Sequence, residues 1–520
     1  NTEIEPEIRY TKNRKTYIWR QNNLPGVQLE SNMPPVDRAL PSVYLSSMQD
    51  WQTIDHWFSD LFAPTQVKDD RVVALAQHLF AGLSTEKDKI KAVFDYMQRN
   101  IRYIGAHVNR GGYQPHAAGE VLQNAYGDCK DQSTLIIALL REANIAAYPV
   151  MINTYAGSQL FDTLPTLDFN HMITYVESAE GPVWLDTSGK TGAFPGINGY
   201  LGGKPAFVVD GRRGKILSLP EVRPEDNRAK ITIDYGFDGA MLNASVVMDL
   251  FGQVETNLRN YVQFSPEKLS AIEQILSPFV YDNRVSDYST TDPVDIQVPF
   301  VLKGQFNNLL EIGADIENFR YSFNYIQVLK VFTGLTQLPP VASRIQDFEI
   351  QLPVTVEVES RYPKPWADAV LASHAVAMNI QNKYFEVTHE MEQQADQVVS
   401  RAKFVLFKQV IPVSDYQAFS DKVEQFKNNS ESLFVYARHQ PEQAPSTEQP
   451  LDVESQIAMT KTLLDEAKFE EALATLKELA KHYGNNAEIH YLLGLSYGFN
   501  GHDTLSEQAF QRAAELGYQF

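Results

Sequence analysis

The sequence contains a single cysteine, and its neighbours make it a candidate nucleophile. Cys129 lies in the segment 126–132, YGDCKDQ, where Gly127 allows a tight turn and Asp128 can cap a helix that begins near the cysteine. A thiol at a helix N-terminus interacts with the helix dipole and with free backbone N–H groups, which favours the thiolate. A lone cysteine is more often a small buried hydrophobic residue. Such a core residue is rarely set between Gly-Asp and Lys-Asp at a turn, so the pattern favours a reactive thiol.

A thiolate nucleophile requires a base, and a histidine follows in a suitable place. His171 begins a predicted strand in the segment FNHMITY, and Asp186 ends the next one in VWLDT. Neighbouring antiparallel strands would place the two side chains together, so that the carboxylate fixes the imidazole tautomer while the other ring nitrogen faces the sulfur. Taken singly, His171 is more often a packed polar residue and Asp186 a turn residue. The order cysteine, histidine, aspartate on helix, strand and strand favours a triad for acyl transfer.

Hydrophobic periodicity predicts the elements that position these residues. Ser84 or Thr85 can cap a helix whose apolar residues recur at spacings of three and four, namely Ile90, Val93, Phe94, Met97 and Ile101. A second helix is predicted over Gln132–Glu142, with its buried side at Leu135, Ile136, Leu139 and Leu140. Extended segments follow at Tyr148–Ile152, His171–Val176 and Val183–Leu185. A helix followed by a short antiparallel sheet is an α+β plan.

Strand signals dominate from about Ala229 onward. Strict alternation of apolar and polar residues predicts one half-buried strand over Phe348–Val358. Further strands are predicted at Ala229–Tyr235, Ala244–Asp249, Val298–Gln305 and Ala402–Val410, with helical insertions near Gln253–Ile275 and Asp415–Phe426. This middle region is therefore predicted to be a β-sandwich with helical insertions.

The two ends of the chain differ from the middle. The opening stretch has a strand-like Thr16–Arg20, a turn at 24–26 and an extended segment at 34–41, which we interpret as the tail of a β-rich domain before residue 1. A polar, Pro- and Gln-rich linker follows residue 438. Beyond it, similar residues recur 34 positions apart, as in Ala472 and Ser506, Leu476 and Phe510, and Leu479 and Ala513. These offsets are typical of tetratricopeptide repeats, which dock peptides or partner proteins; a packing role fits equally well.

Three motifs in order, GDCKD, NHM and WLDT, resemble the bacterial transglutaminase-like superfamily, whose fold is papain-like. The resemblance implies Cys129 as nucleophile, His171 as general base and then acid, and Asp186 as the residue that orients the imidazole. It also implies an oxyanion hole made of the cysteine N–H and an upstream side chain. Tyr103 stands where animal transglutaminases have a Trp, and Gln114 is the second candidate. No cofactor is implied, and the carboxylate spacing of a calcium loop is not evident.

The resemblance covers residues 60–215 for the chemistry and most of 1–430 once the flanking regions are included. The chain is similar to the branch of this superfamily in which a β-rich domain of unknown function precedes the core and a second β-domain follows it. Segment 32–41 looks like the end of the first of these domains. We therefore expect a multidomain α+β protein. Its parts are an N-terminal tail at 1–57, a papain-like transglutaminase core at 58–215, a β-sandwich-like domain at 216–438, a linker at 439–452 and helical repeats at 453–520.

Composition excludes several classes of protein. The net charge of −20 over 520 residues argues against nucleic acid, because phosphate binding requires a basic face. One cysteine excludes an internal disulfide, and the longest apolar runs, such as 135–140, fall far short of the ~18 residues that span a bilayer. His107 and His116 lack metal-ligand spacing, so no metal is predicted, and Gly111-Gly112 is a turn, since no Gly-Lys-Ser/Thr follows.

Three functional hypotheses follow. In the first, the chain is an enzyme that acts on peptide or carboxamide substrates, with water or a second amine resolving the thioester, and Asp128, Lys130 and Asp131 shape the site. In the second, it is a non-catalytic envelope scaffold or protein-interaction module that retains the fold. In the third, it has a biosynthetic or processing role in which the repeats present a peptide to the core. The bacterial resemblance implies a periplasmic or cell-envelope location. Because the sequence starts at Asn1 rather than Met, we expect that an upstream piece was removed or left out, and targeting is not read from this sequence.

Overall fold

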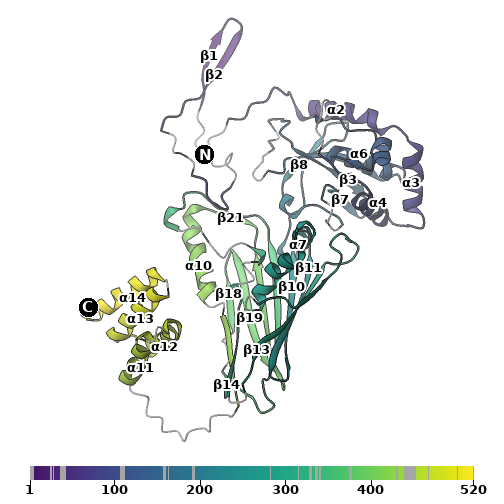
Figure 1. Cartoon of the computed structure of the whole chain (residues 1–520). Helices are drawn as coiled ribbons and strands as arrows, with labels where there is room; N and C mark the ends of the chain where they lie inside the picture. The colour runs from purple at the N-terminus through teal and green to yellow at the C-terminus, as the bar shows by residue number, and fades with distance from the viewer. Residues whose placement is uncertain are drawn as a thin grey trace. The chain divides into compact units, whose positions relative to one another are not determined.

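The computed structural model describes residues 5–23, 26, 28–34, 43–105, 112–155, 160–161, 163–189, 192, 194–280, 283–313, 316–326, 331–333, 338, 341–373, 377–428, 431–438, 453–465, 468–500 and 502–518. The chain divides into two compact units, Asn1–Arg438 and His439–Phe520 (Figure 1). Residues 24–25, most of segment 34–41, His107, Gly111 and the predicted linker 439–452 lie outside the described residues. The opening segment is an antiparallel hairpin of β1 (Glu7–Thr11) and β2 (Arg14–Ile18), which overlaps the predicted strand at 16–20.

A five-stranded antiparallel sheet and the helices that pack on it follow the hairpin. The strand order is β7-β6-β5-β8-β9, with β5 at Ala146–Ile152, β6 at His171–Ser178, β7 at Gly181–Leu185, β8 at Pro205–Val208 and β9 at Lys215–Ser218. The helices are α2 (Trp51–Phe62), α3 (Asp70–Phe80), α4 (Glu86–Asn100), α5 (Ala118–Asn124) and α6 (Cys129–Arg141). Figure 1 shows α6 lying along this sheet, and it packs against β5 and β6. The predicted plan of a helix followed by an antiparallel sheet is confirmed.

Helix α4 forms as the apolar spacing predicts. The side chain of Thr85 accepts from Asp88 N at 3.0 Å and caps its first turn. Its apolar face is fully buried at Ile90, Val93, Phe94 and Met97. These residues share one cluster with Leu135, Ile136, Leu139 and Leu140 of α6. The core on this side of the sheet is therefore built by the two helices that sequence periodicity identified.

Helix α6 begins three residues before the predicted start at Gln132. Its first turn holds Lys130, Asp131 and Gln132, which are polar and nevertheless buried. Hydrophobic periodicity does not detect such a turn, because burial there is compensated by hydrogen bonds and an ion pair rather than by apolar contacts. Cys129 is the first residue of α6 and Asp128 its N-cap, as the segment 126–132 predicts, and the correction concerns only the range given from Gln132.

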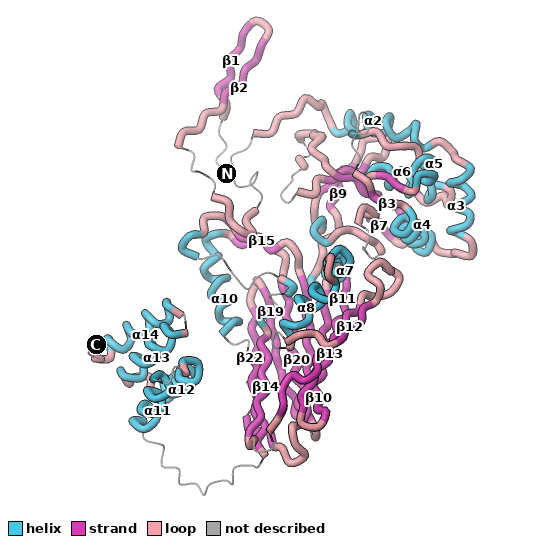
Figure 2. Tube along the Cα trace, viewed as in Figure 1, coloured by secondary structure: helices cyan, strands magenta, loops and turns pink. Residues whose placement is uncertain are grey.

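A part of the chain made mostly of strands, here called the β-rich body, follows strand β9 (Figure 2). Its main sheet has the order β12-β13-β11-β10-β16-β20-β19-β18, at Asp287–Thr290, Val301–Glu311, Met241–Phe251, Arg228–Asp238, Val354–Pro363, Gln397–Leu406, Phe385–Gln393 and Met378–Gln381. A three-stranded sheet has the order β14 (Asn318–Asn324), β22 (Glu431–Ala437) and β17 (Val370–Ser373). The ring of Tyr321 in β14 lies 5.9 Å from Tyr235 and 5.0 Å from Tyr362 of the main sheet. Side chains of the two sheets therefore pack on each other.

The alternating segment 348–358 was predicted as one strand, and the structure corrects this to two strands in different sheets. β15 (Phe348–Ile350) pairs with β21 (Gln409–Ile411), whereas β16 starts at Val354. Pro353 stands at the break, where its missing N–H prevents a continuous ladder. Its carbonyl accepts from Asn227 Nδ2 at 3.0 Å. The predicted strand 402–410 is likewise divided between β20 and β21, and 298–305 is observed at Val301–Glu311.

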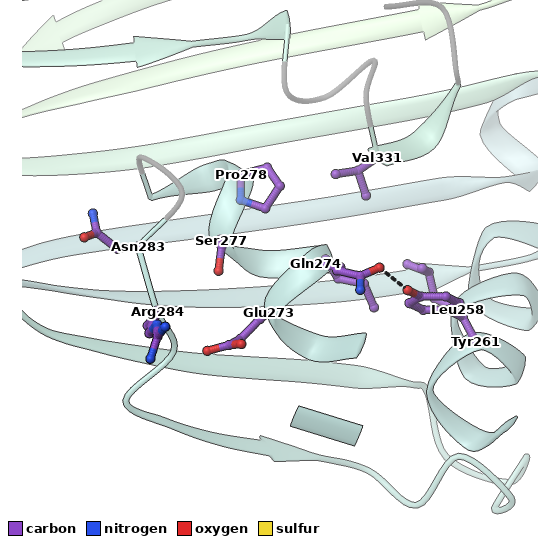
Figure 3. Close-up of a pocket in the computed structure, with 10 residues that line it drawn as sticks. Leu258, Tyr261, Glu273, Gln274, Ser277, Pro278, Asn283, Arg284 and Val331 are labelled. Carbon is purple, nitrogen blue, oxygen red and sulfur yellow. Dashed lines mark hydrogen bonds between the residues drawn. The ribbon is translucent and has the colours of Figure 1, made fainter. Parts of the chain in front are cut away.

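Helices occupy the two predicted insertions of the body. The first contains α7 (Gln253–Phe264) and α8 (Lys268–Leu276), and the second is α10 (Tyr416–Asn428). A cavity of about 660 Å³ lies between α7 and α8 (Figure 3), and Tyr261 donates to Gln274 Oε1 at its edge. All of its lining residues fall within 258–331. This cavity is therefore separate from the triad candidates at 129–186.

The C-terminal unit is helical. Its helices are α11 (Val453–Asp465), α12 (Phe469–His482), α13 (Ala487–Phe499) and α14 (Asp503–Glu515). The first helices of the two pairs start 34 residues apart, as do the second helices. Their assignment as tetratricopeptide repeats stays a prediction. Within the described residues, no helix combines the length and the apolar character that a membrane span requires.

Candidate active site

The first turn of α6 holds Cys129 by a capping box. Asp128 Oδ1 accepts from Lys130 N at 3.1 Å and from Asp131 N at 3.3 Å, while Asp131 Oδ2 accepts from Asp128 N at 3.1 Å. A Cβ added to Gly127 would lie 2.5 Å from the Cβ of Asp131, so only glycine fits before this turn. The half-buried thiol is consequently fixed at the positive end of the helix dipole.

The charged residues next to Cys129 in the chain each have a partner. Lys130 is buried, and its ammonium contacts Asp128 Oδ2. Asp131 Oδ1 accepts from His116 N at 2.8 Å, and His116 Nδ1 lies 3.1 Å from both carboxylate oxygens. These contacts join the loop before α5 to the start of α6. The structure thus gives the three near-site residues positioning contacts around the thiol.

His171 and Asp186 meet at the edge of the sheet, as the strand order predicts. His171 is the first residue of β6, and Asp186 follows the last residue of β7. Their antiparallel register, with Thr174 opposite Leu185, brings the ends of the strands together. His171 Nε2 lies 3.0 Å from Asp186 Oδ2, and the two side chains are 10% and 9% exposed. Because Nε2 is engaged by Asp186, Nδ1 is the ring nitrogen that faces away from this carboxylate.

The pKa shifts of His171 and Asp186 favour the charged form of each residue. Burial alone would lower the pKa of His171, but hydrogen bonds to Asp186 and to Cys129, with the negative charges of both, raise it to about 10. Burial would also raise the pKa of Asp186. The hydrogen bond and charge of His171, together with donors from Ser188, lower the Asp186 pKa below its usual value instead. The imidazolium form of His171 is therefore strongly favoured at neutral pH.

Tyr103 is the oxyanion candidate that lies beside the thiol. It ends the two-residue strand β3 (Arg102–Tyr103), which pairs in parallel with β4 (Tyr126–Gly127) and sets Tyr103 opposite Gly127. Burial and the charges of Cys129, Asp128 and Asp186, with a hydrogen bond to Cys129, raise the pKa of Tyr103 to about 12. Its hydroxyl thus keeps its proton at neutral pH and can donate a hydrogen bond near Cys129.

Gln114, the second oxyanion candidate, has a different position. It is half-buried in the loop before α5, two residues from His116. Of the two candidates, Tyr103 is the one that β-pairing sets opposite Gly127 and whose pKa responds to Cys129, so its position fits an oxyanion donor better.

Two polar contacts were not anticipated from the sequence. Ser188 donates to Asp186 Oδ1 through its backbone N–H at 3.0 Å and its hydroxyl at 2.6 Å. Thr187 donates to Gln132 Oε1 at 2.7 Å, which ties the segment after β7 to α6. Contacts between residues far apart in sequence leave no periodic pattern. The only available signal was the run of serine and threonine directly after Asp186.

Comparison with known proteins identifies this region. Residues 73–186 match the family model of the transglutaminase-like superfamily. The chain contains a transglutaminase-like domain. The match includes Cys129, His171 and Asp186 and ends at the last of them, so the resemblance seen in the three motifs is confirmed for this part of the chain.

A solved structure shares the wider fold. It is a crystal structure described as "a putative protease from Parabacteroides distasonis", with a TM-score of 0.53 over 84% of this chain and 68% of that chain. The two sequences are 13% identical, so the similarity concerns the fold alone. None of the curated proteins compared with the chain matches it. The assignment of the flanking regions to known domains and of the C-terminal helices to tetratricopeptide repeats stays a prediction.

Proposed function

We propose that the transglutaminase-like domain catalyses acyl transfer from a peptide or carboxamide through a thioester on Cys129. The observation that carries the proposal is the position of His171. Its Nε2 lies 3.0 Å from Asp186 Oδ2, and interactions with Asp186 and Cys129 raise its pKa to about 10. A histidine that only filled space would have no need of a buried carboxylate on one side and a thiol on the other.

Acylation starts from the thiolate–imidazolium pair. The sulfur of Cys129 attacks the carbonyl carbon, and a carbon–sulfur bond forms as the carbonyl π electrons move to the oxygen. His171 then gives its proton to the leaving nitrogen, the carbon–nitrogen bond breaks and the amine departs. Asp186 holds the ring in position throughout, because both of its oxygens are already hydrogen-bonded.

Tyr103 would stabilise the oxyanion during this attack. Its hydroxyl lies close enough to Cys129 for the two groups to interact, and its pKa of about 12 keeps it protonated as a donor. Once the carbon–sulfur bond forms, the negative charge leaves the sulfur and develops on the substrate oxygen, so the same donor can turn to that oxygen. The backbone N–H of Cys129 is the expected second donor.

Deacylation distinguishes two activities that share this thioester. Neutral His171 takes a proton from the acceptor, which attacks the thioester carbonyl and releases the thiolate. With water as acceptor, the domain acts as an amidase or protease; with a second amine, it acts as a transglutaminase. Hydrolysis of dipeptidyl coumarin amides and incorporation of a fluorescent primary amine into a glutamine peptide measure the two separately.

Alkylation by iodoacetamide tests the proposal without a known substrate. We expect Cys129 of the full chain to react at pH 6 at least tenfold faster than in His171→Gln, because the imidazolium stabilises the thiolate. His116→Gln is the matched control, since this histidine contacts Asp131 and not the thiol. A slow reaction that His171→Gln leaves unchanged would reject catalysis. The alternative, a non-catalytic scaffold with the transglutaminase fold, would then be preferred.

The remaining parts of the proposal concern cellular context. We propose a cell-envelope location and a docking role for the C-terminal helices, both from the sequence resemblance. Deleting residues 439–520 should then impair processing of the natural partner and leave turnover of small substrates intact. Equal loss of both activities would reject the docking role.

A further inference from the structure

The thiol of Cys129 packs on an apolar cluster that lies on one face of the sheet. Its buried members come from α2 and from three strands, namely Ile54, Phe58, Phe62, Met151, Met172, Phe207 and Val209. Cys129 is one of the half-buried residues in contact with this cluster. Because the attacked carbonyl must come within about 3–3.5 Å of the sulfur, the groups attached to that carbonyl are placed close to apolar surface.

Several side chains of this cluster retain accessible apolar surface. Met48, Trp51, Leu167 and Phe169 are half-buried members, like the thiol itself. Phe169 lies two residues before the base His171, so one segment supplies both. An apolar substrate group placed here would exclude water from this surface, which is favourable.

Trp51 is held in place before any substrate binds. Its Nε1 donates to the carbonyl of Phe161 at 3.1 Å, and its ring lies 4.8 Å from that of Phe207. Phe169 lies 6.4 Å from Trp51 and 6.5 Å from Phe207. Helix α2, which begins at Trp51, is anchored through Asp55, whose Oδ1 accepts from Asp210 N at 2.8 Å. A rigid aromatic wall binds an apolar group with little loss of side-chain freedom.

The charged side chains beside the thiol already have partners. Lys130 is paired with Asp128, and Asp131 with His116. Asp186 is shared between His171 and Ser188. These charges are already compensated, so a charged group entering beside them would lose hydration without gaining an ion pair.

We propose that the acyl donor bears a large apolar side chain, preferably aromatic, next to the attacked carbonyl, and that Trp51 and Phe169 bind it. The inference rests on the proposed acyl transfer by Cys129. It assigns specificity to one residue before the catalytic motifs, Trp51, and to one between them, Phe169, while the buried Phe207 supports the ring of Trp51. Trp51 and Phe207 lie outside the family match at 73–186, and Phe169 lies inside it.

The test uses the full chain and four N-acetyl aminoacyl chloromethyl ketones with Phe, Ala, Asp or Lys side chains. The Cys129 thiolate displaces chloride, so a carbon–sulfur bond forms while the carbon–chlorine bond breaks and chloride leaves with the electron pair. We expect the Phe reagent to modify Cys129 on the order of 10- to 100-fold faster than the Asp and Lys reagents. Rates within threefold of one another for all four reagents would overturn the inference.

Variants of the two tryptophans of α2 show which residue produces the preference for the Phe reagent. Trp51→Ala should reduce the ratio of the Phe rate to the Ala rate to near one, and Trp51→Phe should keep most of it. Trp57→Ala is the matched control, because Trp57 is on the same helix but is 38% exposed and meets Tyr113 edge to face; it should keep the full ratio. An equal fall with all four reagents in Trp51→Ala would overturn the inference, since Trp51 would then act on the thiol and not on the acyl side chain.

Iodoacetamide separates this inference from the function on which it rests, because it has no side chain to bind. Fast iodoacetamide alkylation with equal chloromethyl ketone rates would reject the apolar specificity alone. Slow alkylation that is insensitive to His171→Gln would reject the acyl-transfer function and the specificity with it.

Discussion

The hydroxyl of Ser188 lies 2.6 Å from Oδ1 of Asp186, while His171 holds the other oxygen at 3.0 Å. The carboxylate that orients the base is therefore itself oriented by a residue two positions later in the chain. Because Asp186 is almost fully buried, the loss of a donor to it cannot be replaced easily by water.

Replacing Ser188 by alanine should lower kcat by about 10-fold and leave KM within twofold, since a hydrogen bond to a charged group contributes roughly 1.5–3 kcal/mol and the backbone donor remains. The pKa of Asp186 should also rise, so the acid limb of the pH–rate profile should move to higher pH. Ser178→Ala is the matched control: this serine donates to Gly181 O at 2.7 Å in the turn between β6 and β7. An unshifted acid limb in Ser188→Ala would show that Ser188 does not position the carboxylate.

Removing the hydroxyl of Tyr103 should affect turnover much more than alkylation. In Tyr103→Phe we expect kcat for acyl transfer to fall on the order of 100-fold, the usual effect of losing an oxyanion donor. Iodoacetamide reacts by displacement of iodide without forming an oxyanion, so its rate should change less than fivefold. Tyr126→Phe, at an exposed position of the partner strand β4, should resemble the unaltered chain. Equal losses in both reactions would contradict an oxyanion role.

The ion pair of His171 should make stability depend on pH. Its pKa is raised from the ordinary 6.5 to about 10, so the contribution is complete below pH 6.5 and disappears as pH rises through 10. The difference in unfolding free energy between the native chain and His171→Gln should shrink over this window. All five tryptophans lie in residues 1–438, so their fluorescence in urea follows the unit that contains the site. A difference that grows from pH 6.5 to 10 would contradict the ion pair.

Substituting Gly127 should disturb the capping box. In Gly127→Ala the new methyl group would meet the Cβ of Asp131 at 2.5 Å, and relieving this overlap should cost about 1–3 kcal/mol of stability. The rapid alkylation of Cys129 should fall with it, because the thiol moves relative to His171. Gly236→Ala, at a position with open space, is the comparison. Retention of both properties in Gly127→Ala would show that the turn adapts.

The candidate site could be predicted from the sequence because its members lie in short motifs of unusual composition. Cys129, His171 and Asp186 are each at the boundary of an element, where periodicity ends and a polar residue is conspicuous. Ser188 and Gln132 were missed as contributors, because their roles depend on contacts across the fold. The early start of α6 was missed for a related reason: its first turn is buried through polar contacts.

Outside the site, the pattern of apolar residues predicted the helices and strands wherever the spacing of these residues alone determines the element. Helix α4 and strands β5, β6 and β7 were predicted to within a few residues. Alternation across 348–358 concealed the break at Pro353, since period-two burial continues on both sides of it. The side-chain alternation of a strand does not reveal which sheet the strand joins; here the proline and Asn227 decide that.

The aromatic wall beside Cys129 is built from parts of the chain that the three catalytic motifs do not include. Trp51 precedes the family match and Phe207 follows it. The part of this surface that Trp51 supplies is thus encoded apart from the catalytic motifs and can change independently of them. Relatives with the same triad could acquire a different substrate specificity by exchanging the segment around 43–62. Grafting that segment between two of them should transfer the specificity without altering the reaction.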